Sequence, residues 1–214
     1  MMKILITNDD GIRSEGLRLL VDWAKQLGEV TVAAPKTEQS GKSHGIELLK
    51  PFEAKQVELE PGIMAYGVES TPADCVRFAL FGLNLEFDLV ISGINRGLNV
   101  GTDIMYSGTV GAASEAVNLG IPAVALSTTP ANYPNATAHL DEILAYFREN
   151  NLMGIHNLYN VNIPAHPKGI RITHQGGPYY SDSFPSTGEE GMYVASGKCV
   201  HENGGDLTLD TDAV

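Results

Sequence analysis

Short apolar runs alternate with amphipathic segments along the first two thirds of the chain. Four runs have the length and branching of strands buried in a parallel sheet: residues 4–6, 30–34, 88–92 and 121–126. Amphipathic spacing or capping residues predict helices between and after them, at residues 17–27, 72–81, 110–118 and 137–150. Residues 53–68 predict two strands around a turn. This alternation predicts an α/β fold built on a mostly parallel, doubly wound sheet.

The pattern changes after Tyr159. Residues 170–173 alternate between apolar and polar, and glycine and proline punctuate residues 175–191. We therefore expect a single domain over residues 1–214. Its α/β core is expected at about residues 1–160, with β-hairpin extensions at about residues 161–214.

Composition narrows the class of protein. The formal net charge of −12 argues against nucleic-acid binding, which requires a basic surface. No apolar run reaches the roughly 18 residues that span a bilayer, and the N-terminus lacks the basic and apolar regions of a signal peptide. Cys75 and Cys199 make neither a disulfide framework nor a zinc pattern, and we expect small buried thiols. We therefore expect a cytoplasmic protein with no nucleic-acid or membrane partner.

The first apolar run ends in the sequence Asn8-Asp9-Asp10-Gly11. Open α/β sheets bind ligands outside the carboxyl ends of their strands, which is where Asp9 and Asp10 are expected. Two adjacent carboxylates repel each other unless a cation or a proton compensates, and oxygen ligands suit Mg²⁺, Mn²⁺ or Ca²⁺. The alternative is an ordinary turn, because Asn, Asp and Gly favour turns for local reasons.

Two further loops follow predicted strands and carry oxygen ligands. One contains Ser40 and the other contains Asn95. If the strands are neighbours, a hard cation would be held by Asp9, Asp10, the Ser40 hydroxyl and the Asn95 amide carbonyl. The alternative for Ser40 and Asn95 is a purely local role in a turn. His44 lies in the Ser40 loop, and we weigh contact with a substrate below an ordinary surface position.

The segment at residues 106–113 predicts an anion site. It places Ser107, Gly108 and Thr109 at the start of a helix rich in small residues. Free backbone N–H groups and the positive end of a helix bind phosphate, and the two hydroxyls add donors. Together with Asn99, these residues form the predicted phosphate-binding site. The alternative is an ordinary helix cap, and neither the P-loop nor the dinucleotide fingerprint is present.

With these motifs in place, the chain resembles the survival protein SurE family of metal-dependent nucleoside-monophosphate phosphatases. Several long motifs in the same order are more specific than any one of them. The segments that carry the resemblance span about the first 130 residues: 6–11, 34–35 with 39–41, 71–76, 88–99 and 106–113.

The resemblance implies one divalent ion, Mg²⁺ or Mn²⁺, held by Asp9, Asp10, Ser40 and Asn95. It implies a Rossmann-like core whose projecting hairpins build homodimers or homotetramers. The implied activity is removal of phosphate from nucleoside 5′- and 3′-monophosphates and, in some members, cleavage of short polyphosphate.

Two positions depart from the family pattern. Ser70 stands where the family usually has Gly, and the chain stops at residues 212–214 where the family usually continues into a strand. We expect the second departure to affect the oligomeric state more than the metal site.

We therefore expect an enzyme, a metal-dependent phosphomonoesterase, with Asp9 or Asp10 helping to orient the attacking water. One alternative uses Asp9 or Asp10 as a nucleophile in an aspartyl-phosphate mechanism, which the absence of an Asp-x-Asp pattern disfavours. The other alternative is a non-catalytic sensor that binds metal and nucleotide. No segment indicates a base-specific pocket.

Overall fold

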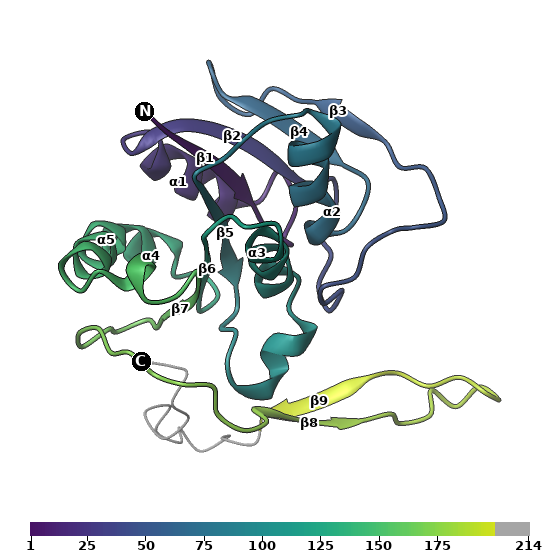
Figure 1. Cartoon of the computed structure of the whole chain (residues 1–214). Helices are drawn as coiled ribbons and strands as arrows, with labels where there is room; N and C mark the ends of the chain where they lie inside the picture. The colour runs from purple at the N-terminus through teal and green to yellow at the C-terminus, as the bar shows by residue number, and fades with distance from the viewer. Residues whose placement is uncertain (200–214) are drawn as a thin grey trace.

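The computed structural model describes residues 1–199 and is shown in Figure 1. Its centre is a seven-stranded sheet in the order β3-β4-β2-β1-β5-β6-β7. Neighbouring strands run parallel, except that β3 pairs antiparallel with β4 at one edge. The predicted α/β class with a mostly parallel sheet is therefore confirmed. The strands are β1 (Met2–Thr7), β2 (Gly28–Pro35), β3 (Ala54–Gln56), β4 (Met64–Val68), β5 (Leu89–Arg96), β6 (Ala123–Thr128) and β7 (Leu158–Ile163).

Helices cover both faces of this sheet (Figure 1). One face carries α1 (Glu15–Ala24), α4 (Tyr133–Ala138) and α5 (Leu140–Glu149), and the other carries α2 (Pro72–Arg77) and α3 (Gly108–Asn118). Successive strand residues point to opposite faces, so Ile4 and Ile6 pack on the α1 side and Leu5 packs on the α3 side. Because both faces are covered, the middle of each central strand is mostly apolar, as in residues 4–6 of β1 and 123–126 of β6. Three short helical segments complete the core: η1 (Phe78–Gly82), η2 (Gly101–Tyr106) and η3 (Leu152–Gly154).

Side-chain caps set the starts of the first two helices. Ser14 Oγ accepts a hydrogen bond from the backbone N–H of Leu17 at 3.4 Å. Thr71 Oγ1 accepts one from the backbone N–H of Asp74 at 3.1 Å, with a proline in the first turn. The cap predicted at Thr71 is therefore confirmed.

Two predicted elements were wrong and one strand was missed. β5 continues to Arg96, beyond the expected end at residue 92. The prediction ended the strand too early because glycine and asparagine are uncommon inside strands. The single helix expected at residues 137–150 is two helices, α4 and α5, which meet at His139. Pro134 permits the earlier start because proline fits the first turn of a helix. β7 was not anticipated, since its two asparagines lower the strand propensity.

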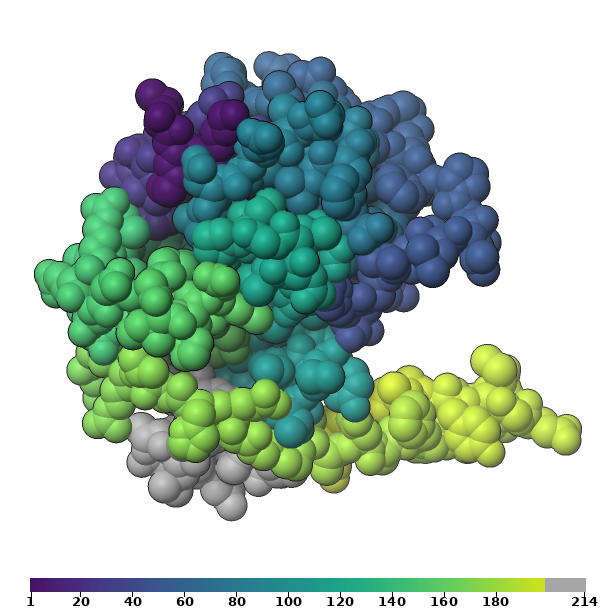
Figure 2. Space-filling view, viewed as in Figure 1, coloured from purple at the N-terminus to yellow at the C-terminus, as the bar shows by residue number. Residues whose placement is uncertain are grey.

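A hairpin of β8 (Tyr180–Ser183) and β9 (Ser196–Cys199) follows the sheet. Figures 1 and 2 show it as an arm that extends away from the body of the molecule. A C-terminal hairpin was predicted and is confirmed, but residues 170–173 form no strand. The predicted extension past residue 199 and the departure at residues 212–214 lie outside the described residues. Within residues 1–199, no helix has both the length and the apolar character that a membrane crossing demands.

Candidate metal and phosphate site

The candidate site lies where the strand order of the sheet reverses. β1 has β2 on one side and β5 on the other, and the chain builds the sheet outward in both directions from there. Ligands of open α/β sheets bind at such switch points. Asp9 and Asp10 follow β1, and the backbone N–H of Arg96 in β5 donates to Asp10 Oδ2 at 3.0 Å. The structure therefore brings the carboxylate pair next to the segment that carries Asn95.

Asn8 fixes the turn that presents the two carboxylates. It is fully buried, and its Oδ1 accepts from the backbone N–H of Gly11 at 3.2 Å. Its Nδ2 donates to the Gly11 carbonyl at 3.1 Å and to Ser14 Oγ at 2.7 Å. Gly11 has a φ of +99°, a conformation that favours glycine. The alternative interpretation of Asn8-Asp9-Asp10-Gly11 as a turn is thus correct for Asn8 and Gly11, which leaves the two carboxylates free for another role.

Asp9 is buried against the start of α3. Its side chain is 4 % exposed, and Thr109 Oγ1 donates a hydrogen bond to its Oδ1. Burial is the main cause that raises the pKa of the Asp9 carboxyl to about 6; the neighbouring charge of Asp10 contributes to this rise, and the hydrogen bond from the Thr109 hydroxyl opposes it. The Asp9 charge is therefore only partly compensated by the protein.

Asp10 is less buried than Asp9, but its pKa is also raised. Burial raises the pKa of the Asp10 carboxyl, and the negative charge of Glu38 adds to the rise. The backbone N–H of Arg96 lowers it. Both members of the pair thus favour a proton or a cation more than an isolated aspartate does.

Asn95 and Ser40 are placed differently from each other. The pairing of β5 with β6 shifts between Ser92 and Asn95, and such irregularities re-aim side chains. Asn95 Nδ2 donates to the Gly97 carbonyl at 2.8 Å, which orients its amide. Ser40 is exposed and its Oγ donates to Glu38 Oε1 at 2.6 Å. Its loop nevertheless begins at the site, because the preceding backbone N–H donates to the Asp9 carbonyl at 2.7 Å.

The start of α3 lies directly on the carboxylate pair. A Cβ added to Gly108 would come within 2.8 Å of Asp9 Cβ and 3.0 Å of Asp9 Oδ2, so only glycine fits there without movement. Ser107 is the N-cap, since its Oγ accepts from the backbone N–H of Val110 at 3.1 Å. Thr109 is fully buried and its hydroxyl is engaged by Asp9. Gly108 and Thr109 therefore lie against Asp9, and the hydroxyls of Ser107 and Thr109 already have hydrogen-bond partners within the protein.

Asn99 is held by side chains that the sequence analysis did not identify. Its backbone N–H donates to Asn162 Oδ1 at 2.8 Å, and its carbonyl accepts from Asn160 Nδ2 at 2.7 Å and Asn162 Nδ2 at 2.8 Å. Its own Nδ2 donates to Ser127 Oγ at 2.7 Å. The available signal was the Asn-Val-Asn spacing at residues 160–162, which places two amides on one face of a strand.

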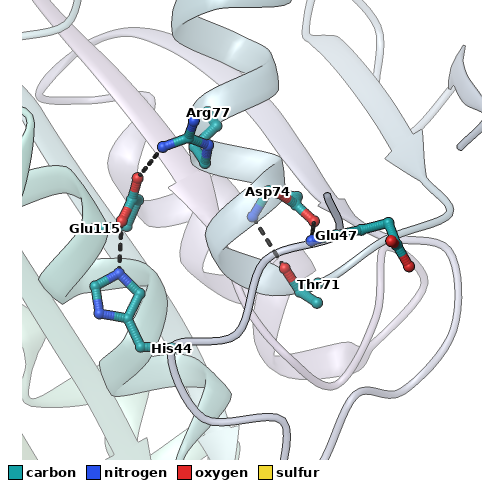
Figure 3. Close-up of polar contacts among 6 residues, drawn as sticks. All are labelled: His44, Glu47, Thr71, Asp74, Arg77 and Glu115. Atoms are coloured by element: carbon teal, nitrogen blue, oxygen red, sulfur yellow. Dashed lines mark hydrogen bonds and ion pairs between the residues drawn. The ribbon is translucent and has the colours of Figure 1, made fainter. Parts of the chain in front are cut away.

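His44 contacts the protein rather than the predicted phosphate site. Its Nε2 lies 2.6 Å from Glu115 Oε2, and Glu115 Oε1 accepts from Arg77 Nη1 at 2.8 Å (Figure 3). Glu115 lies seven residues beyond Gly108 on α3, about 10 Å along the helix axis. Figure 3 also shows Asp74 accepting from the backbone N–H of Glu47, at 2.8 Å. These contacts fasten the Ser40 loop to α2 and α3.

Among the described residues, no group of three or more His, Cys, Asp or Glu side chains is arranged to hold a metal ion. A divalent ion at Asp9 and Asp10 would therefore also need neutral oxygen donors. Hydroxyl and amide oxygens of the kind carried by Ser40 and Asn95 suit hard cations such as Mg²⁺.

Comparison with known proteins places this architecture in a family. The profile of the family described as "Survival protein SurE" matches residues 4–182. The crystal structure of the SurE protein from Aquifex aeolicus is 32% identical in sequence and superposes with a TM-score of 0.74. The match covers 92% of this chain and 82% of the Aquifex aeolicus chain.

Curated relatives agree with this placement. The protein named 5'-nucleotidase SurE from Thermoanaerobacter sp. (strain X514) is 43% identical over 195 residues, covering 86% of this chain and 75% of that protein. The protein of the same name from Thermosipho melanesiensis is 37% identical and covers 100% of this chain and 87% of its own length. The family match, the fold and the carboxylate pair agree, and the chain belongs to the SurE family.

Proposed function

We propose that this chain is a metal-dependent nucleotidase that hydrolyses nucleoside 5′-monophosphates, and also 3′-monophosphates, to nucleoside and phosphate. The observation that carries the proposal is the placement of Asp9 against the first turn of α3, where a Cβ on Gly108 would lie 3.0 Å from the carboxylate. A cation site and an anion site thus share one point of the molecule. Relatives that bear the name 5'-nucleotidase SurE support the substrate class.

The donor set fits one hard divalent cation, Mg²⁺ or Mn²⁺. Asp9, Asp10, Ser40 and Asn95 would hold it, and the burial that raises the pKa of both carboxyl groups supports this, because a bound cation would stabilise their charged forms. When bound, the ion supplies polarisation of a phosphoryl oxygen and activation of water. Asn95 is prepared for this role, because its Nδ2 is engaged by the Gly97 carbonyl and its Oδ1 is the remaining ligand atom.

The protein's own groups bind and orient the phosphate. Gly108 allows the substrate to approach the first turn of α3, whose N–H groups and positive end favour an anion. Ser107 and Asn99 lie on either side of η2 in sequence and complete the anion site. Thr109 acts through Asp9, since its buried hydroxyl fixes the orientation of that carboxylate. Asp9 or Asp10 helps to orient the attacking water.

The non-catalytic sensor is the weaker alternative, because the curated relatives are named as nucleotidases. An aspartyl-phosphate mechanism is also weaker. Asp9 and Asp10 do not form an Asp-x-Asp pattern, and Asp9, one of the two candidate nucleophiles, is only 4 % exposed.

We propose further that the protein assembles into homodimers or homotetramers through the hairpin arm and acts in the cytoplasm. A two-stranded hairpin is marginal on its own in water, and this one exposes Phe184, Met192, Tyr193 and Val194. Light scattering after chromatography measures the assembly. A variant with Phe184→Ser and Tyr193→Ser is expected to shift it to a smaller species.

Phosphate release from adenosine 5′-monophosphate, with and without EDTA, tests the proposed activity. Chelation should stop the release, and Mg²⁺ or Mn²⁺ should restore it. Adenosine 3′-monophosphate and tripolyphosphate in the same assay define the substrate range. Full activity after exhaustive chelation would exclude the metal-dependent reaction, and binding without turnover under all metals would favour the sensor.

A further inference from the structure

The segment after β5 crosses the ends of β6 and β7 without forming a regular strand. Its first anchor is the backbone N–H of Gly97, which donates to the Thr128 carbonyl at 2.8 Å. Gly97 and Gly101 have φ values of +134° and +57°, so the backbone on both sides of Asn99 adopts conformations that favour glycine. The path between them therefore depends on side-chain hydrogen bonds rather than on a strand or helix.

Two asparagines of β7 supply those bonds to a single residue. The amide of Asn162 pairs with both the N–H and the carbonyl of Asn99, each at 2.8 Å, as a neighbouring strand would. Asn160 Nδ2 adds a second bond to the same carbonyl at 2.7 Å. We refer to the side chains of Asn160 and Asn162 as the asparagine clamp. Its three hydrogen bonds fix the orientation of the Asn99 backbone.

The asparagine clamp acts on the face of the sheet that carries the anion site. Asn160 is paired with Ala125 and Asn162 with Ser127, so these side chains share one face. Ala125 belongs to the core under α3. Ser127 holds the Asn99 side chain from the same direction, at 2.7 Å. The first turn of α3 and Asn99 are therefore supported from one surface of the sheet.

We propose that Asn160 and Asn162 are positioning residues, which fix Asn99 so that its amide meets the phosphate of the substrate. The proposal rests on the proposed function, in which Asn99 binds phosphate. A site held in its productive geometry before binding loses less entropy when the ligand arrives. The clamp consists of uncharged amides, so it does this without adding charge next to an anion.

Two substitutions of different size test the clamp. Asn162→Ala removes two hydrogen bonds to Asn99, and Asn160→Ala removes one. In Asn162→Ala we expect both the inhibition constant for inorganic phosphate and the KM for adenosine 5′-monophosphate to rise about tenfold. In Asn160→Ala we expect both constants to rise about threefold. The dissociation constant for Mn²⁺ should stay within about twofold, because Asp9 and Asp10 belong to a different strand end.

Asn150→Ala is the matched control, since its exposed amide donates only to the Tyr146 carbonyl at the end of α5. Unchanged phosphate inhibition in Asn162→Ala would overturn the proposal, and an equal loss of Mn²⁺ affinity would show that the clamp merely supports the sheet edge. If Asn162→Ala fails to fold, Asn160→Ala decides. Asn160 Oδ1 is buried without a hydrogen-bond partner among the described residues. Asn160→Ala removes this unsatisfied atom, so we expect the substitution to cost little stability.

The same measurements separate this proposal from the proposed function. A wild-type protein that releases no phosphate from any nucleotide would refute the activity. Calorimetric binding of inorganic phosphate would then still test the clamp, because weaker binding in Asn160→Ala and Asn162→Ala supports it and equal binding overturns it.

Discussion

The carboxylate side and the amide side of the site are built on opposite electrostatic principles. On the carboxylate side, Asp9 and Asp10 are crowded together and burial raises the pKa of each. On the amide side, Asn99 is held by neutral groups at 2.7–2.8 Å. One side carries charge that a cation relieves, and the other is held in place by neutral hydrogen bonds. We therefore expect metal ions and pH to act on the first side only.

The largest effect should come from removing one charge of the pair. Asp9→Asn or Asp10→Asn should lower kcat/KM by more than about a hundredfold, because a lost metal ligand costs more than a lost supporting group. The measurement is phosphate release from adenosine 5′-monophosphate together with Mn²⁺ affinity. In the metal-free protein the same change should raise the free energy of unfolding, since it removes a buried charge.

Wild-type turnover in Asp10→Asn at unchanged metal concentration would contradict the assignment of the metal site. Asp182→Asn is the matched control, because Asp182 is an exposed carboxylate on the hairpin arm. Its activity should equal that of the wild type.

The next largest effect should come from Gly108, where the proposed metal and phosphate sites meet. Gly108→Val would place a Cβ within 2.8 Å of Asp9 Cβ and 3.0 Å of Pro72 Cγ. It should therefore weaken both phosphate binding and Mn²⁺ binding, each by about tenfold or more. The structure thus couples two effects that a purely phosphate-binding glycine would separate. Steady-state kinetics and metal titration on one preparation measure both.

Gly177→Ala provides the control, since a Cβ at Gly177 meets no atom within 4 Å. Normal Mn²⁺ affinity in Gly108→Val with a raised KM would show that Asp9 is free to move aside. That result would make Gly108 a feature of the phosphate site alone.

The carboxylate side was predictable from the sequence and the amide side was not. Asp9 and Asp10 directly follow a short apolar run, so their place at a strand end follows from chain direction alone. The partners of Asn99 come from a strand some 60 residues later, and its asparagines resemble loop residues. The contact between Gly108 and Asp9 also joins distant segments. Local patterns reveal elements and their ends, whereas such pairings depend on how the elements pack.

A smaller effect should appear in the pH dependence of stability. In the folded state the pKa of Asp9 is raised from 3.8 to about 6. Between pH 3.8 and pH 6 the folded state therefore binds a proton at Asp9 that the unfolded state has lost. Stability of the metal-free protein is therefore highest at low pH within this window and falls as the pH rises through about 6. Between pH 5 and pH 7.5 the loss from Asp9 should be about 1.4 kcal/mol.

Urea unfolding in EDTA across this pH range measures the loss. Asp10 changes stability in the same direction, because burial also raises its pKa. In Asp9→Asn the slope should become shallower, and saturating Mn²⁺ should reverse its sign in the wild type. A flat profile in the metal-free wild type would show that solvent reaches Asp9 more freely than its burial indicates.

The smallest effect should come from the contacts that fasten the Ser40 loop. Glu115→Gln weakens the ion pair with Arg77 and the hydrogen bond with His44, and we expect a loss of about 1 kcal/mol in the free energy of unfolding. The value is modest because both partners are more than 30 % exposed. Lys36→Ala is the control, since its exposed ion pairs should leave the urea midpoint unchanged. If Glu115→Gln instead weakened Mn²⁺ binding as strongly as Asp10→Asn, the Ser40 loop would belong to the charged side of the site, and His44 would help to set its ligand geometry.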